Sequence, residues 1–278
     1  MIVSHLGVAV DVDTEDGQRI RMRVPRRSGY VVGDAVEVFG ERLGLVPRRT
    51  QLLRRSPGGG IHVVAANLDL LAVVAAVDPP ARAGLVDRAA VAARAGGIEP
   101  ILVLNKIDLP SGNDVLREAE ARVAGEFPVL AVSARSGAGL EALAACIARH
   151  GRAAFVGSSG VGKSSLMNQL AGIDLATRTL SQATGGGRHT TSVSTLHRLP
   201  TGGELVDTPG VREFGLVDVT PEDLARFFPG FCVVTDACRF RDCRHAEEPG
   251  CAIRAAVDDA RIPMPRYIAY RTLLDELR

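Results

Sequence analysis

Lysine, aromatic side chains and long apolar runs are all scarce in this chain of 278 residues. Of its 33 basic residues only Lys106 and Lys163 are lysine, so arginine supplies almost all of the positive charge. The apolar stretch 68–77 is interrupted by Asp69 and is too short to cross a bilayer. The N-terminus lacks a basic region followed by a long apolar core, which argues against a secretory signal. The sequence therefore predicts a globular protein of the cytoplasm with no membrane association.

The positive charge is unevenly distributed, although the net charge is only +1. Residues 17–60 hold ten arginines against Asp34, Glu37 and Glu41, so this segment is suited to facing a polyanion. An arginine-rich surface typical of a lysine-poor proteome is the alternative. Tyr30 and Phe39 are the only aromatic residues in the first 60, which favours contacts with RNA phosphates over base stacking there.

The first 60 residues predict a small β-barrel. Short strands are expected at 3–10, 20–24, 35–39 and 43–46, and glycines separate them. The stretch 54–60 contains Pro57 and three glycines and is favoured as a linker. We expect an RNA-binding domain over residues 1–60.

Apolar runs alternate with alanine-rich helical segments from residue 61 onward. This alternation predicts a mostly parallel sheet with helices on both faces. After residue 217 the pattern becomes helical and starts at a Thr220 N-cap. Strands are expected at 68–77, 101–104, 129–132, 153–156 and 204–206, and helices at 82–95, 114–125, 139–148, 163–170 and 265–277.

A phosphate-binding loop is predicted where the strand 153–156 gives way to a helix. Residues 157–164 match G-x-x-x-x-G-K-[ST], in which backbone N–H groups and the helix N-terminus hold phosphates. Lys163 reaches the β and γ oxygens, and Ser164 ligates Mg²⁺. The nucleotide-binding residues expected here are Gly157, Ser158, Ser159, Gly160, Val161, Gly162, Lys163, Ser164 and Ser165.

A guanine-reading motif comes earlier in the chain. Asn105, Lys106 and Asp108 form N-K-x-D directly after a predicted strand, which places them at the carboxyl edge of the sheet. The Asp108 carboxylate can accept both N–H groups of guanine, whereas adenine would place an acceptor against it. Ser133 and Ala134 follow the next strand and make the motif more specific, although Arg135 stands where lysine is commonest.

The third motif, D-T-P-G, comes last and ends at Gly210. Asp207 can hold Mg²⁺, and the backbone amide of Gly210 can contact the γ-phosphate. Many GTPases carry a glutamine next, but Val211 is apolar and cannot orient water. The glycine-rich interval before Asp207 offers Thr190 or Thr191 for Mg²⁺ and γ-phosphate; which of the two is the ligand stays open.

His189, in the same interval, either positions water or is a solvated loop residue.

The three motifs stand in a circularly permuted order, with N-K-x-D first and D-T-P-G last.

A separate cluster predicts a structural zinc site. Cys238, Cys243, His245 and Cys251 supply three thiolates and one imidazole, the donor set of tetrahedral Zn²⁺ with no open position. Cys146 and Cys232 stand apart, so in a reducing compartment the clustering favours metal over disulfides. The spacing is unlike a common zinc finger, which leaves a coincidental cluster as the alternative.

Together these residues resemble the RsgA (YjeQ/YloQ) family of circularly permuted GTPases, which act in late maturation of the small ribosomal subunit. The resemblance covers nearly the whole chain. It rests on the permuted motifs, the cysteine cluster with Glu248-Pro249-Gly250, and the motifs Val32-Gly33-Asp34, Pro47-Arg48, Ala65-Ala66-Asn67-Leu68-Asp69, Gly187-Arg188-His189-Thr190-Thr191, Arg266-Tyr267 and Tyr270.

The resemblance implies an OB-fold barrel (1–60), a permuted P-loop GTPase domain (61–216, motif order G4-G5-G1-G2-G3) and a helical zinc-binding domain (217–278). It further implies hydrolysis of GTP to GDP and phosphate with Mg²⁺, stimulated by the small subunit, and binding to that subunit and its rRNA. A catalytic role for His189 beside Lys163 and Gly210 is implied as well. Nothing in the sequence requires more than a monomer. The alternatives are a permuted GTPase acting on the large subunit and a non-hydrolysing RNA-binding protein that uses nucleotide structurally.

Overall fold

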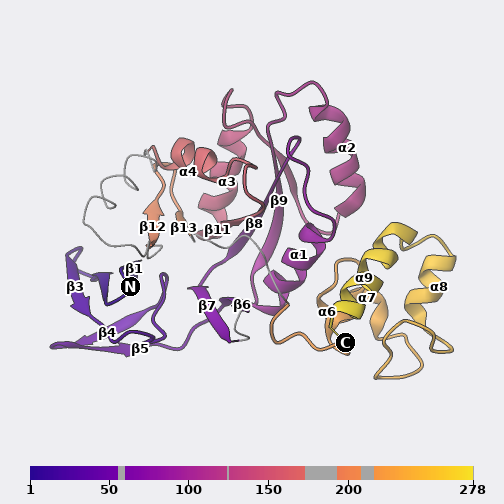
Figure 1. Cartoon of the computed structure of the whole chain (residues 1–278), viewed down its shortest axis with the longest axis horizontal. Coiled ribbons are helices and arrows are strands. Elements are labelled where there is room, and N and C mark those ends of the chain that lie inside the picture. Colours follow the sequence, from indigo (N-terminus) through magenta and orange to yellow (C-terminus); the bar gives the residue numbers. More distant parts are fainter. Residues whose placement is uncertain (56–59, 124, 173–192, 208–215, 278) are drawn as a thin grey trace.

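The computed structural model describes residues 1–55, 60–123, 125–172, 193–207 and 216–277 (Figure 1). These residues form a large mixed sheet with helices on both faces, a strand-rich N-terminal part and a helical C-terminal part. No helix among them combines the length and apolarity needed to span a bilayer.

The centre of the sheet is parallel, as the alternation of apolar and helical segments predicts. Its strands are β10 (Val129–Ala131), β9 (Glu99–Asn105), β8 (Leu70–Ala76), β11 (Arg152–Val156) and β13 (Glu204–Asp207), in that spatial order. Every residue of β8 is buried, which fits a strand covered on both faces. All five expected strands are confirmed to within a few residues.

Helices cover the two faces in pairs. α1 (Leu85–Ala95) and α2 (Gly112–Val123) pack on one face, where they share a core with Leu71 and Val73 of β8. α3 (Leu140–His150) and α4 (Lys163–Ala171) pack on the other, against Leu70 and Ala72. Successive β8 side chains thus point to opposite cores, as strand geometry requires.

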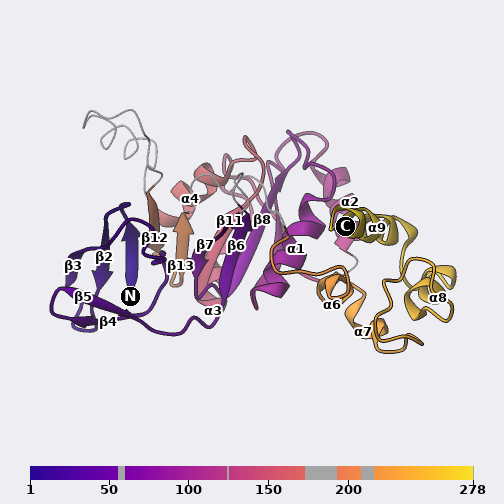
Figure 2. The same cartoon turned by 60° about the horizontal axis from the view of Figure 1, so that its bottom comes forward.

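The sheet continues beyond β13 with four antiparallel strands, in the order β12 (Ser194–Arg198), β1 (Ile2–His5), β2 (Ala9–Asp13) and β3 (Arg19–Arg23). The N-terminal segment is therefore hydrogen-bonded to the central sheet, and β1 lies beside β12 in both views (Figures 1 and 2). The prediction of one strand over 3–10 is wrong, because the chain turns at Gly7, whose φ is +86°.

The remaining N-terminal strands form two hairpins. β4 (Val36–Phe39) pairs with β5 (Arg42–Leu45), and β6 (Gln51–Arg55) pairs with β7 (Ile61–Ala66). The stretch 54–60, favoured as a linker, thus connects two strands of one hairpin. A small core of Ile2, Val10, Val12 and Val24 lies beneath the N-terminal strands, with Tyr30, Val36 and Leu43 packed against it.

The C-terminal part is helical, with α6 (Leu224–Phe227), α7 (Cys232–Thr235), α8 (Ala252–Asp258) and α9 (Met264–Glu276). Phe228, Phe231 and Tyr270 form its aromatic centre, with ring centroids 4.7–5.3 Å apart. Val91 of α1 belongs to the same core, so this part is anchored on the first helix of the central domain. The buried Arg266 strengthens the junction by donating to the carbonyl oxygens of Pro229 and Arg122.

Candidate functional site

The predicted phosphate loop joins β11 to α4 in a backbone conformation that requires glycine. Gly157, Gly160 and Gly162 have φ values of +152°, +82° and +95°. A Cβ on Gly157 would lie 2.2 Å from the carbonyl oxygen of Val74, and one on Gly162 would lie 2.3 Å from Nδ2 of Asn105. Larger side chains are therefore excluded at both positions.

Lys163 is held over this loop by the loop itself. Its Nζ donates to the carbonyl oxygens of Gly157 and Ser158 at 2.8 and 2.7 Å, which places the ammonium where phosphate oxygens would bind. Ser164 and Ser165 are exposed in the first turn of α4, whose N-terminus adds positive potential. Ser159 and Gly160 are exposed at the crest of the loop, and Val161 is buried beneath it.

Asn105 connects three loops from a position that is only 1% exposed, at the end of β9. Its Nδ2 donates to the carbonyl oxygen of Val161 at 2.8 Å, and its Oδ1 accepts from the backbone N–H of Ala134 at 3.1 Å. These two bonds brace the loops on either side of Asn105. The backbone N–H of Ala134 is thus held by Asn105 at the edge of the base-reading motif.

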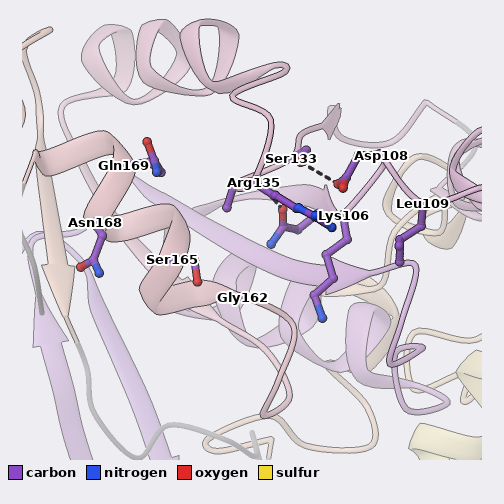
Figure 3. Close-up of a pocket in the computed structure, with 11 residues that line it drawn as sticks. Lys106, Asp108, Leu109, Ser133, Arg135, Gly162, Ser165, Asn168 and Gln169 are labelled. Carbon is purple, nitrogen blue, oxygen red and sulfur yellow. Dashed lines mark hydrogen bonds between the residues drawn. The ribbon is translucent and has the colours of Figure 1, made fainter. Parts of the chain in front are cut away.

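The geometry around Asp108 suits recognition of guanine. The buried Ser133 donates from its Oγ to Oδ1 of Asp108 at 2.6 Å (Figure 3). This hydrogen bond, helped by the charges of Arg135 and Lys106, lowers the pKa of the exposed Asp108 carboxyl. An ionised carboxylate accepts two hydrogen bonds, which matches the two N–H groups on the Watson–Crick edge of guanine.

Lys106 closes the other side of the site. Its backbone has a left-handed φ of +63°, and its Nζ donates to the carbonyl oxygens of Asp78 and Gly160 at 2.6 and 2.8 Å. The methylene groups of the Lys106 side chain therefore span from the base-reading loop, which carries Asn105 and Asp108, to the phosphate loop. A ribose and base can lie against them.

A pocket of about 470 Å³ lies between these groups, in the size range of small-molecule sites (Figure 3). The residues from the predicted set that line it are Asn105, Lys106, Asp108, Ser133, Ala134, Gly162 and Ser165. Those that sequence reasoning left out of the site are Leu109, Arg135, Asn168 and Gln169. Asn168 and Gln169 could have been predicted from the sequence, because they follow Ser165 by three and four positions and therefore share its helix face.

Asp207 lies at the carboxyl end of β13, one strand away from the phosphate loop. Burial raises the pKa of this carboxyl, and the nearby charge of Lys163 opposes the rise. A carboxylate at this edge, together with the Ser164 hydroxyl, suits a hard oxygen-seeking cation such as Mg²⁺. His189, Thr190, Thr191, Gly210 and Val211 lie outside the described residues.

The four predicted zinc ligands come together. The donor atoms of Cys238, Cys243, His245 and Cys251 all lie within 4.8 Å of one another. Nδ1 of His245 is 3.4 Å from the sulfurs of both Cys238 and Cys251, so the imidazole faces the thiols. Burial raises the pKa of Cys243 and lowers that of His245, so both groups are disfavoured in their charged forms. Three thiols and one imidazole converging in a buried space fit tetrahedral Zn²⁺.

The backbone around the cluster is fixed by groups beyond the four ligands. Burial alone would raise the pKa of Glu248, but backbone N–H donors that include those of Arg244, Ala246 and Glu247 lower it to about 2. Tyr267 donates from its hydroxyl to the carbonyl oxygen of His245 at 2.7 Å. Such outer contacts orient the ligands, and the sequence showed Glu248 only as part of a motif.

Comparison with known proteins places these sites in a family context. Residues 45–217 match the model of the RsgA GTPase family. The chain is 41% identical over 297 residues to the small ribosomal subunit biogenesis GTPase RsgA of Azotobacter vinelandii, covering 100% of this chain and 85% of that protein. It is 40% identical over 289 residues to the protein of the same name from Pseudomonas aeruginosa strain UCBPP-PA14, covering 98% of this chain and 84% of that protein.

Two solved structures share the fold over almost the whole chain. YjeQ from Thermotoga maritima superimposes with a TM-score of 0.78 at 29% identity, covering 100% of this chain and 97% of that one. YloQ, a circularly permuted GTPase, superimposes with a TM-score of 0.71 at 24% identity, covering 99% and 93%.

Proposed function

The chain belongs to the RsgA GTPase family, and from this premise we propose that it binds GTP with Mg²⁺ and hydrolyses it to GDP and phosphate during late maturation of the small ribosomal subunit. One observation carries the proposal. Asn105 bonds to both Val161 and Ala134, so the N-K-x-D motif, the phosphate loop and the segment that carries Ser133 and Ala134 meet at one pocket. The curated relatives at about 40% identity bear the name of a small-subunit biogenesis GTPase.

Within this pocket the described residues take complementary roles. Asp108 accepts from the guanine edge, Lys106 lies along the ribose and base, and the phosphate loop with Lys163 holds the β and γ phosphates. Ser164 and Asp207 hold Mg²⁺, which neutralises charge on the phosphates. Phosphoryl transfer relies mainly on positioning and electrostatic stabilisation, and a preassembled loop with glycine at 157 and 162 supplies both.

The assignment of the water-positioning residue rests on sequence. Val211 follows Gly210 and is apolar, so we propose that His189 orients the attacking water and that the amide of Gly210 contacts the γ-phosphate. Thr190 or Thr191 completes the Mg²⁺ shell. A large-subunit target and a non-hydrolysing scaffold remain as outcomes of the test below.

We further propose the three-domain division at residues 1–60, 61–216 and 217–278, in which the β6–β7 hairpin bridges the first two domains. The first domain is an OB-fold, and the third holds one structural zinc ion. The exposed side chains of Arg23, Arg26, Arg27, Arg42 and Arg55 support contact of the first domain with rRNA phosphates. The cytoplasm is the compartment where such a factor meets ribosomal subunits, and a monomer suffices for the activity.

The test is GTP hydrolysis by the purified chain, alone and with isolated small or large subunits. We expect strong stimulation by small subunits only, and loss of that stimulation in His189→Ala. His62→Ala is the matched control, since His62 is exposed on β7 away from the motifs. Stimulation by large subunits alone would identify the protein as a permuted GTPase that acts on the large subunit. An absence of hydrolysis under every condition would favour a non-hydrolysing, nucleotide-dependent RNA-binding protein.

A further inference from the structure

Exposed aromatic rings are rare on this molecule. Among the phenylalanine and tyrosine residues that the structure describes, only Phe39, at 62%, and Phe240, at 39%, are exposed. Phe240 lies between two zinc-cluster cysteines, Cys238 and Cys243, in the segment Arg239-Phe240-Arg241-Asp242. All four residues of this segment are exposed, so the cluster presents an aromatic ring with a cation on each side.

The segment is held in place on both sides. The N–H of Arg239 donates to the carbonyl oxygen of Gly250 at 3.2 Å, and the N–H of Cys243 donates to the carbonyl oxygen of Phe240 at 3.4 Å. The side chain of Arg239 packs over Gly250, where an added Cβ would lie 3.1 Å from the Cβ of Arg239. Presentation of the ring by a fixed loop lowers the conformational entropy lost on binding.

The charges around the ring are available to a partner. The guanidinium carbon of Arg239 lies 5.3 Å from the centroid of the Phe240 ring, within the range of a cation–π contact. Neither Arg239 nor Arg241 forms an ion pair within the described part of the chain, whereas Arg244 pairs with Glu222. Two such guanidinium groups flanking an exposed ring match the two chemical features of single-stranded nucleic acid, a flat base and an anionic backbone.

We propose that Phe240 is a stacking platform for one unpaired RNA base, with Arg239 and Arg241 binding the adjoining phosphates. The inference rests on the proposed function, because it names the part of the subunit, unpaired rRNA, that the zinc-bearing domain would contact. Charge complementarity selects RNA over an apolar protein surface as the partner.

The absence of tryptophan from the chain makes a direct test available. Phe240→Trp places a single indole at the site, and stacking of a base on it quenches the emission. Ile268→Trp is the matched control, since Ile268 is 57% exposed in the same domain, on α9. The probes are an unstructured uridine oligoribonucleotide and isolated small subunits. We expect both probes to quench the emission of the Phe240→Trp variant and neither to quench that of the control.

Affinity measurements separate stacking from charge. Phe240→Leu keeps an apolar side chain without a π face, and we expect binding of small subunits to weaken about tenfold with an unchanged salt dependence. Arg239→Gln should weaken binding and also reduce its salt dependence, as loss of a phosphate contact does. Basal GTP hydrolysis should stay unchanged in both variants.

Several outcomes would overturn the inference. Unquenched emission with both probes, or wild-type affinity in Phe240→Leu, would show that Phe240 is not a stacking platform. A blue shift without quenching on small subunits would indicate an apolar protein surface instead. Quenching by the oligoribonucleotide, combined with no binding of small subunits by the wild-type chain, would uphold the platform and reject the proposed function, so the two failures are distinguishable.

Discussion

The side-chain amide of Asn105 donates to the carbonyl oxygen of Val161 at 2.8 Å, which joins the base-reading loop to the phosphate loop across 56 positions of sequence. Chain order is irrelevant to this contact, because β9 and β11 both end at the same edge of the sheet, on either side of β8. A permuted chain therefore rebuilds the same pocket as long as the strand order in space is kept.

Asn105→Ala should weaken GDP binding by about 2 kcal/mol, or roughly thirtyfold. The substitution leaves the carbonyl of Val161 without its partner in a buried position, and the N–H of Ala134 without its partner in a partly buried one. Titration with a fluorescent GDP analogue measures the loss. Asn113→Ala, at an exposed position of α2, is the control and should bind like the wild type. Equal affinities for the two variants would show that the loops hold their positions without Asn105.

Asp108→Asn should exchange the preferred base. The amide retains one acceptor oxygen but adds a donor, which opposes the exocyclic amino group of guanine and matches the O2 carbonyl of xanthine. Competition between GDP and XDP for the same site measures the change, and we expect the order of affinities to reverse. Continued preference for GDP would mean that Asp108 does not read the base.

Ser133→Ala should make GDP binding more sensitive to acid. The Ser133 hydroxyl holds the pKa of Asp108 below its ordinary value, and only the ionised carboxylate accepts both guanine N–H groups. Affinity is therefore complete above this pKa and is lost as the pH falls through it. Because the variant raises the pKa, its affinity should decline at a higher pH than that of the wild type.

The measurement is GDP affinity from about pH 7 down to about pH 4, a range that reaches the ordinary pKa of an aspartate. Ser136→Ala removes a neighbouring exposed hydroxyl that does not contact Asp108 and should follow the wild-type profile. Superimposable profiles for Ser133→Ala and the wild type would contradict the prediction.

The convergence of the candidate site residues was largely predictable from sequence because these residues are contiguous motifs at strand ends. Asp108 and Ser133 follow apolar strands, and parallel strands place their carboxyl ends together. The pairing of β1 with β12 was not predictable, since it joins Ser4 to Thr195, two residues far apart in the sequence that belong to no motif.

Side-chain contacts between segments that are far apart in the sequence could not be predicted either. Arg266 was seen as part of a family motif, yet its bonds to Pro229 and Arg122 depend on how the C-terminal helices dock on the central domain. The cluster of three cysteines and one histidine was predictable because these residue types seldom lie close together in a sequence unless they bind a metal. The role of Glu248 was hidden, because its partners are backbone N–H groups.

One zinc ion per chain is expected by elemental analysis, and Cys251→Ser should abolish it. Cys251 is also the N-cap of α8, where its sulfur accepts from the N–H of Arg254 at 3.4 Å. Serine is a favoured N-cap, so the loss of stability reflects the metal, whose binding contributes on the order of 10 kcal/mol in structural sites.

The readouts are zinc content and the thermal midpoint, which should fall. Cys232→Ser changes an exposed cysteine outside the cluster and should leave both unchanged. Full zinc content in Cys251→Ser would assign the ion to another set of ligands.

Arg48→Ala should destabilise the N-terminal part by about 3–5 kcal/mol. Asp34 is fully buried, and both of its carboxylate oxygens accept from Arg48, at 2.7 and 2.9 Å. Removal of the arginine leaves a buried charge with only the N–H of Val31 as its partner among the described contacts. Denaturant unfolding measures the change in the free energy of unfolding.

The adjacent Arg49 provides a matched control for this ion pair. It bonds to Asp69, but its side chain is 63% exposed, so solvent screens the pair and Arg49→Ala should cost less than about 1 kcal/mol. Replacing both Asp34 and Arg48 with apolar residues should restore most of the loss, because no unpaired charge remains. Equal destabilisation by Arg48→Ala and Arg49→Ala would show that burial of Asp34 does not determine how much the Arg48–Asp34 ion pair contributes to stability.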